Sequence, residues 1–209
     1  CSSDLQFHAF TEDGGYAEPA YWPGAAHEWL NGGAKDWDWP HPVLKEWYLK
    51  RRFPISHPMD FGPEFLSPNS PCVGVSWFEA DAYVRWLQSR FDPADWGLGP
   101  GWRPMLASEA EWELAARWDG RGANRVVPWA MPGAMEAPDG RCNFKGADIQ
   151  RTSTVGLFSP EGDAYCGAAD MVGNVWEWCR DPWMPLGTAE EQRSFQDAAE
   201  DSAFDQKIG

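Results

Sequence analysis

The sequence has few basic residues and no long apolar run. Lys and Arg number 17 against 32 Asp and Glu, which gives a net charge of -15. Such a surface repels phosphate backbones and anionic lipid, so nucleic acid and membranes are not expected partners. No apolar run approaches the roughly 20 residues that a membrane-spanning helix needs. We therefore expect a soluble, cytoplasmic protein with one domain over residues 1–209.

Paired cysteine motifs are also missing. The five cysteines form neither a CxxC pair nor a Cys/His zinc spacing, and they are Cys1, Cys72, Cys142, Cys166 and Cys179. An odd, scattered set is typical of thiols in a reducing compartment. A single disulfide, such as Cys142 with Cys166, is the alternative.

Turn-forming and aromatic residues, by contrast, are abundant. The chain holds 21 Gly, 18 Pro and 15 Trp, which predicts a loop-rich domain held together by large aromatic side chains. A Trp-rich insertion spans residues 22–70, and its indoles either pack onto the domain, the favoured interpretation, or form a binding face. Residues 187–209 are rich in acids and are expected to form a surface insert or tail.

Two stretches carry clear helix start signals. In "SWFEADAYVRWLQSRF", Ser76 can cap a helix and Glu79 can complete a capping box. In "SEAEWELAARW", Ser108 and Glu111 repeat the same spacing. Apolar residues follow each box at helical spacing, so both stretches are predicted to be amphipathic helices packed on one side.

The stretch "DMVGNVWEWCRDPW", residues 170–183, combines acids, a glycine and indoles. Calcium takes six to eight oxygen ligands, and a glycine permits the sharp bend that brings carbonyls together. Asp170 and Glu177 are therefore candidate calcium ligands. Alternatively, the two acids are hydrogen-bonding groups that lock a turn without metal. Trp176 and Trp178 alternate with Glu177 and are expected in the core.

Five stretches occur in an order that resembles one family. They are "PCVGVSWFEADAYVRWL", "RPMLASEAEWELAARW", "VVPWA", "CNFKG" and "DMVGNVWEW", and they are similar to the formylglycine-generating enzyme superfamily, also called the sulfatase-modifying factor family. The resemblance implies an α+β, C-type-lectin-like fold with two main helices, few short strands and much irregular loop. It also implies that the family's first strand region and C-terminal segment are absent from this sequence.

The resemblance further implies two calcium loops. Carried over position by position, the ligands of the first loop are the side chains of Asp170 and Glu177 and the carbonyls of Gly173 and Val175. The second loop falls at "CNFKGADIQRTSTVG", where Asn143 and the Phe144 carbonyl match. Calcium is therefore the expected structural ion, and copper is expected only for a catalytic member.

The chain departs from the oxidising members of the family. Those members carry an "RGGSW"-like stretch followed by a pair of copper-binding cysteines, which this sequence lacks, and neither Cys166 nor Cys179 matches that pair. We therefore expect a non-catalytic ligand-binding or protein-binding display module, such as the variable protein of a diversity-generating retroelement. The alternative is a copper-dependent formylglycine-generating oxidase, or a related oxygen-dependent enzyme, whose catalytic cysteines lie outside this chain.

Overall fold

The computed structural model describes residues 4–118 and 140–182, and this part of the chain is rich in helix. The α-helices are α1 (Asp4–Glu12), α2 (Ala25–Leu30), α3 (Pro42–Leu49), α4 (Trp77–Gln88) and α5 (Glu109–Arg117). Short 3-10 helices are η1 (Pro19–Tyr21), η2 (Gly33–Asp36), η3 (Pro63–Phe65), η4 (Pro93–Trp96) and η5 (Lys145–Ala147). None of these described helices is long and apolar enough to cross a membrane.

Strands are scarcer than expected. Over residues 4–118 and 140–182 the backbone forms no β-strand, and only isolated bridge positions occur, at Pro71 and Trp118. The "CVGV" stretch before α4, whose sequence is typical of a short buried strand or an extended lead-in, forms no strand. The acidic stretch at 187–209 lies outside the described residues.

Helices α4 and α5 begin where the sequence predicts. The Ser76 hydroxyl accepts from the Glu79 backbone N–H at 3.2 Å, and the Glu79 carboxylate accepts from the Ser76 N–H at 2.8 Å. The same reciprocal pair joins Ser108 and Glu111, at 3.1 and 2.7 Å. Both capping boxes are confirmed, and each satisfies donors that a helix start would otherwise leave without partners.

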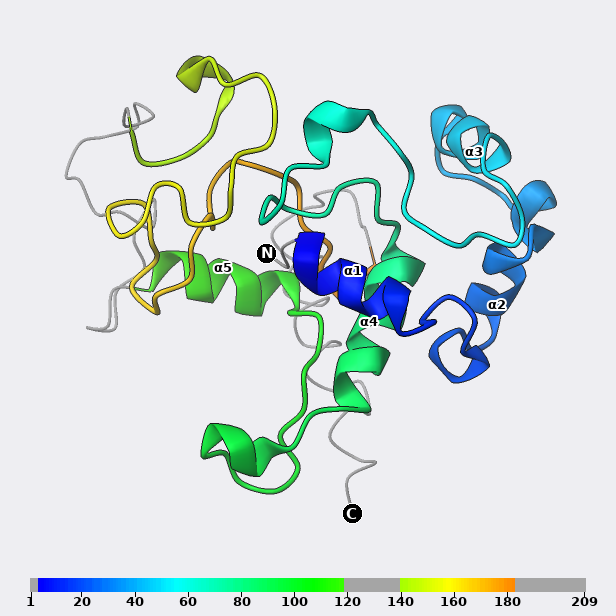
Figure 1. Ribbon diagram of the computed structural model, residues 1–209, viewed down its shortest axis with the longest axis horizontal. Helices are drawn as coiled ribbons and strands as arrows, with labels where there is room; N and C mark the ends of the chain where they lie inside the picture. Colours follow the sequence, from blue (N-terminus) through cyan, green and yellow to red (C-terminus); the bar gives the residue numbers. More distant parts are fainter. Residues whose placement is uncertain (1–3, 119–139, 183–209) are drawn as a thin grey trace, which may run out of the picture.

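The first third of the chain contains helices that the sequence analysis missed. Both α2 and α3 are short, and the surrounding Gly and Pro residues obscure their periodicity. In α3, Pro42 occupies the first turn, where its missing N–H costs nothing, and His41 Nδ1 accepts from the Val43 N–H at 3.2 Å. Figure 1 shows α2 and α3 on one side of α4 and α5 on the other, with α1 alongside α4.

An aromatic core lies between α1 and α4. Phe10 is fully buried, and its ring meets those of Tyr83 and Trp86 at centroid distances of 6.0 Å in each case. Phe7 stacks on Tyr83 at 5.4 Å. Each such ring removes on the order of 150–250 Å² from water, so these contacts fix how α1 crosses α4.

The Trp-rich stretch extends this core, which confirms packing as the main role of its indoles. Trp22 and Trp29 are buried, and Trp37 and Trp39 are partly buried against the same cluster. Trp47 is the exception, with 40% of its surface exposed. The indoles of Trp22, Trp29, Trp37 and Trp39 therefore belong to the domain core.

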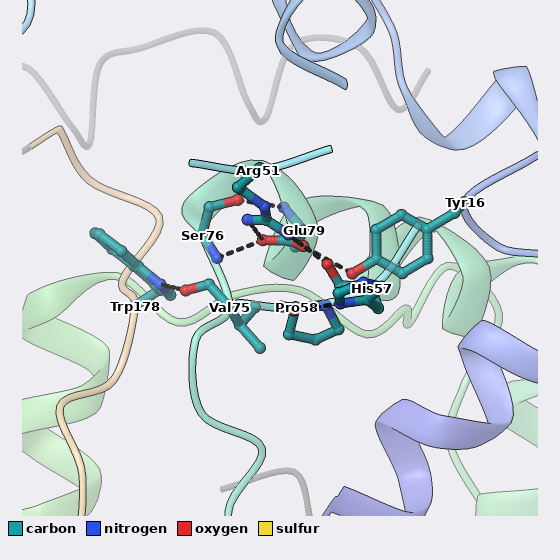
Figure 2. Close-up of polar contacts among 8 residues, drawn as sticks. All are labelled: Tyr16, Arg51, His57, Pro58, Val75, Ser76, Glu79 and Trp178. Carbon is teal, nitrogen blue, oxygen red and sulfur yellow. Dashed lines mark hydrogen bonds and ion pairs between the residues drawn. The ribbon is translucent and has the colours of Figure 1, made fainter. Parts of the chain in front are cut away.

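A buried carboxylate joins the first third of the chain to α4 (Figure 2). Glu79 is completely buried and accepts from the Tyr16 hydroxyl at 2.7 Å. It also accepts from both terminal nitrogens of Arg51, at 2.7 and 3.2 Å, and from the Ser76 N–H. The Arg51 guanidinium lies 5.1 Å from the centre of the Trp29 ring. The partners of Glu79 thus come from different segments of the fold.

Burial and the neighbouring Glu79 charge raise the pKa of Tyr16 well above its ordinary value. The Tyr16 hydroxyl therefore keeps its proton and acts as a donor to the carboxylate. Removing Arg51 would leave a buried negative charge without its cation, which is more costly than the loss of an exposed ion pair.

We predict that Arg51→Leu lowers the free energy of unfolding by about 3–5 kcal/mol. The matched control is Arg85→Leu, which breaks a partly exposed pair with Asp81 within α4 and is expected to cost about 1 kcal/mol or less. Urea denaturation of both variants measures the difference. Equal losses would show that the Glu79 network does not hold the first third of the chain to α4.

Candidate functional site

The segment 174–182 lies across the N-terminus of α4. The Trp178 indole donates to the Val75 carbonyl at 2.8 Å (Figure 2), and the Trp77 indole donates to the Cys179 carbonyl at 3.0 Å. Val75 and Trp77 flank Ser76, the residue that caps α4. The two indole bonds run in opposite directions, so the segment and the helix start hold each other in place.

The same segment also contacts the N-terminus of α5. The Arg180 N–H donates to the Ala107 carbonyl at 2.8 Å, and the Asp181 carboxylate accepts from the Glu109 N–H at 2.5 Å. These contacts flank Ser108, which caps α5. No local signal in the sequence could reveal this contact of Asp181, because Glu109 lies 72 residues away.

The two indoles of the motif face outward. Trp176 is fully exposed and Trp178 is about half exposed, whereas the Glu177 carboxylate accepts from the Trp112 indole of α5 at 3.0 Å. The expectation that both indoles lie in the core is wrong. The Glu177 side chain points inward to the Trp112 indole of α5. Because successive side chains alternate in direction, Trp176 and Trp178 point to the opposite side, toward solvent. Exposed indoles of this kind can stack on planar ligands or bind cationic groups.

The structure brings the two candidate calcium loops together. The Asn174 N–H donates to the Asn143 carbonyl at 2.8 Å. Gly173 has a φ of +78°, and a Cβ at this position would lie 2.2 Å from the Asn143 oxygen, so a side chain does not fit. The Asn174 side chain accepts from the Ser153 N–H and donates to the Ser153 carbonyl. These contacts tie residues 143, 153 and 173–174 into one layer of loops.

The candidate acids have separate partners in this layer. Asp170 is buried, with 8% of its surface exposed, and its carboxylate accepts from the Gly156 N–H at 2.9 Å. Glu177, in contrast, is engaged by Trp112 of α5. Met171, next to Asp170, packs against Ala116 of α5 and so fixes the loop on that helix. The hydrogen-bonding role that the sequence left open for the two acids is therefore present.

The remaining candidate ligands are placed as follows. Asn143 is buried and donates through its side-chain amide to the Arg151 carbonyl at 2.8 Å, and the Phe144 carbonyl accepts from the Ala147 N–H at 2.9 Å. Val175 is partly buried. Residues 4–118 and 140–182 contain no group of three or more His, Cys, Asp or Glu side chains that could hold a metal ion.

The donor chemistry of the two loops nevertheless suits calcium. Carboxylates, an amide and backbone carbonyls are the hard oxygen ligands that calcium takes. Next to them, the buried hydroxyls of Thr152 and Ser153 have no hydrogen-bond partner within the described part of the chain. The calcium site stays a prediction.

Cys179 and Cys166 lie in different environments. Burial, Glu109, Asp181 and Glu177 raise the pKa of the Cys179 thiol. Cys166 is exposed, and its thiol lies 3.5 Å from the Ala115 carbonyl.

Cys142 also keeps a protonated thiol. Burial, followed by the charge of Asp170, raises its pKa. Both Cys142 and Cys166 are free thiols, so the disulfide that the sequence allowed between them is not formed.

Comparison with known proteins identifies the family. The sulfatase-modifying factor enzyme 1-like domain matches residues 3–199. The chain belongs to this family. It is similar to hercynine oxygenases of Mycolicibacterium thermoresistibile (28% identical over 194 residues) and Mycolicibacterium smegmatis (32% over 189), each match covering 88% of this chain. It is also similar to the formylglycine-generating enzyme of Thermomonospora curvata, 32% identical over 197 residues and 87% of this chain.

The matches cover only part of each relative. The chain spans 34% and 36% of the two hercynine oxygenases and 57% of the formylglycine-generating enzyme. The expectation of a non-catalytic binding or display module is wrong, because relatives similar over most of the chain are named as enzymes. The mismatch of Cys166 and Cys179 with the copper-binding pair does not argue against an enzyme, since relatives of this chain are named as oxygenases.

We predict that the cysteines of this sulfatase-modifying factor domain differ sharply in reactivity. At pH 8, iodoacetamide should alkylate the exposed Cys166 well before Cys142 and Cys179. A raised pKa leaves less thiolate at a given pH, and the thiolate is the reactive form. Mass spectrometry of peptides taken over time measures the order. Alkylation of Cys179 as fast as that of Cys166 would contradict the environment described here.

Proposed function

We propose that this protein is an oxygen-dependent enzyme of the hercynine oxygenase class, in which the sulfatase-modifying factor domain binds the substrate. The observation that carries the proposal is the similarity to hercynine oxygenases over 88% of the chain. We assign no oxygen-activating group to the described residues.

The surface around Trp176 and Trp178 is the proposed substrate-binding face. Hercynine carries a trimethylammonium group, and indole rings bind quaternary ammonium groups through cation–π attraction. Both indoles are accessible, and the protein carries a net charge of -15, which favours a cationic group. The bond from Trp178 to Val75 fixes one of the two rings before substrate arrives.

A second candidate function is the oxidation of a protein cysteine to formylglycine. It is favoured by the Thermomonospora curvata relative, of which the chain covers 57%. The two candidates differ in substrate, since one acts on a small betaine and the other on a cysteine-containing peptide.

The C-type-lectin-like arrangement of the family and its domain boundaries are part of the proposal. Its support is the family membership, together with the two capped helices α4 and α5 and the irregular chain around them. Cytoplasmic location likewise stays a prediction from the sequence.

The activity is tested with the full-length protein under labelled ¹⁸O₂. We expect oxygen uptake that depends on hercynine and a labelled product in the mass spectrum. Trp176→Ala should raise KM for hercynine by about 3-fold to 30-fold, the effect of losing a cation–π contact. Trp96→Ala, which removes an exposed indole from η4, is the matched control and should leave KM unchanged.

One result would overturn the proposed reaction, and another would overturn the proposed substrate-binding face. Conversion of a cysteine peptide without any reaction of hercynine would favour the second candidate. Equal KM values for Trp176→Ala and Trp96→Ala, with hercynine turnover intact, would retain the activity but move the substrate away from the motif indoles.

We expect calcium to act as a structural ion held by the loop layer. The residues that would hold it are Asp170 and Glu177 with the carbonyls of Gly173 and Val175, and Asn143 with the Phe144 carbonyl. An ion that binds only the folded state stabilises it by about 2.7 kcal/mol at a concentration of 100 times Kd.

Calcium should therefore raise the melting temperature of the wild-type protein by several degrees, and a chelator should lower it. Glu177→Gln should lose most of this response, yet its amide oxygen can still accept from the Trp112 indole. Glu161→Gln, which alters an exposed acid, is the control and should respond as wild type does. Differential scanning calorimetry decides: identical calcium responses in all three proteins would rule out Glu177 as a ligand.

A further inference from the structure

Two partly buried indoles hold the chain that carries the proposed substrate-binding face. The Trp112 indole of α5 donates to the Glu177 carboxylate at 3.0 Å. The Trp77 indole of α4 donates to the Cys179 carbonyl, also at 3.0 Å. Glu177 and Cys179 precede and follow Trp178 in the sequence. The two bonds therefore fix the chain on both sides of this residue, each from a different helix.

Packing around the two rings holds both donors in place. The Trp112 ring packs against a cluster that contains Ala116 and Met171. The Trp77 ring meets the Phe78 ring edge to face, at a centroid distance of 5.9 Å. An indole has a single N–H and no acceptor. Each of these bonds therefore fixes one point of the segment 174–182 relative to one helix.

The bond from Trp112 decides which side of the segment faces solvent. Successive side chains of an extended stretch point in opposite directions. Because Glu177 is bound to α5, the neighbouring Trp176 and Trp178 point outward, and Trp176 is fully exposed. The Trp178 indole then bonds to the Val75 carbonyl (Figure 2), which gives its ring a fixed direction. The outward position of both rings thus depends on donors that lie behind them.

We infer that Trp77 and Trp112 are positioning residues of the proposed substrate-binding face. They act through residues 177–179, to which they bond, and hold Trp176 and Trp178 toward solvent. The inference rests on the proposed function, because it takes the two exposed indoles as the groups that bind the substrate. A face that is already ordered loses less entropy when the substrate binds. Loss of either bond therefore weakens substrate binding and leaves the chemical step unchanged.

The test replaces each donor by phenylalanine, which keeps a ring and removes the N–H. In the full-length protein, Trp112→Phe and Trp77→Phe should each raise KM for hercynine by about threefold to tenfold, the effect of one hydrogen bond. Their kcat should stay within about twofold of wild type, since only binding is affected. Trp39→Phe is the matched control, because the Trp39 indole is also partly buried and donates to a carbonyl, that of Ala34, at 3.0 Å. It should leave KM unchanged.

A second measurement does not depend on turnover. Protein labelled with 5-fluorotryptophan gives ¹⁹F signals for Trp176 and Trp178, which are assigned by replacing each of them with phenylalanine. Trp112→Phe should shift both signals, and Trp77→Phe should shift that of Trp178. Trp39→Phe should shift neither. Circular dichroism melts check that each variant is folded, and since the two variants remove different bonds, either one that folds carries the test.

The two readouts separate this inference from the proposed reaction. Unchanged ¹⁹F signals in the donor variants, or KM values equal to that of Trp39→Phe while hercynine is turned over, overturn the inference. Shifted signals in a protein whose wild type does not turn over hercynine support the positioning of the two indoles and reject the proposed reaction alone.

Discussion

The buried carboxylate of Glu79 is the interaction on which the rest of this fold depends. A fully buried charge is stable only when it is paired and hydrogen-bonded, and its partners come from Tyr16, Arg51 and Ser76. These residues belong to three separate segments. The first third of the chain, though rich in turns, is therefore fixed on α4. Val75 adjoins this network, and its carbonyl accepts from the Trp178 indole. The network therefore also positions the segment 174–182.

The N-termini of α4 and α5 together hold the segment 174–182 in place. In each capping box, the backbone next to the capping serine is free to bond with residues 178–181. Helices α4 and α5 also contribute one indole donor each, from Trp77 and Trp112. Regular sheet is therefore not needed to hold this segment among the described residues. The cost of this arrangement is that Trp176 and much of Trp178 lie outside the core. Exposed indoles at a well-fixed site are typical of ligand recognition.

Family membership and catalytic chemistry are separate matters in this protein. Neither Cys166 nor Cys179 matches the copper-binding pair of the oxidising members, and that mismatch led to the expectation of a non-catalytic module. Hercynine oxygenases among the relatives show that the family's domain also occurs in enzymes of another kind. One fold supports several chemistries because the reacting groups lie on a few variable segments. How well the cysteines of such a domain match the motif of one member is therefore a poor test of whether the domain takes part in catalysis.

The sequence by itself determined the features whose partners lie within a few residues. Both capping boxes could be read from it, because a Ser and a Glu three residues apart meet in any helix start. Only the tertiary structure decided which way the motif side chains face. Glu177 meets Trp112 across 65 residues, and Glu79 meets Tyr16 across 63. Such contacts depend on how the helices pack, and the local spacing of residues does not encode that packing. The outward position of Trp176 and the binding of Tyr16 and Arg51 by Glu79 therefore appear only in the folded chain.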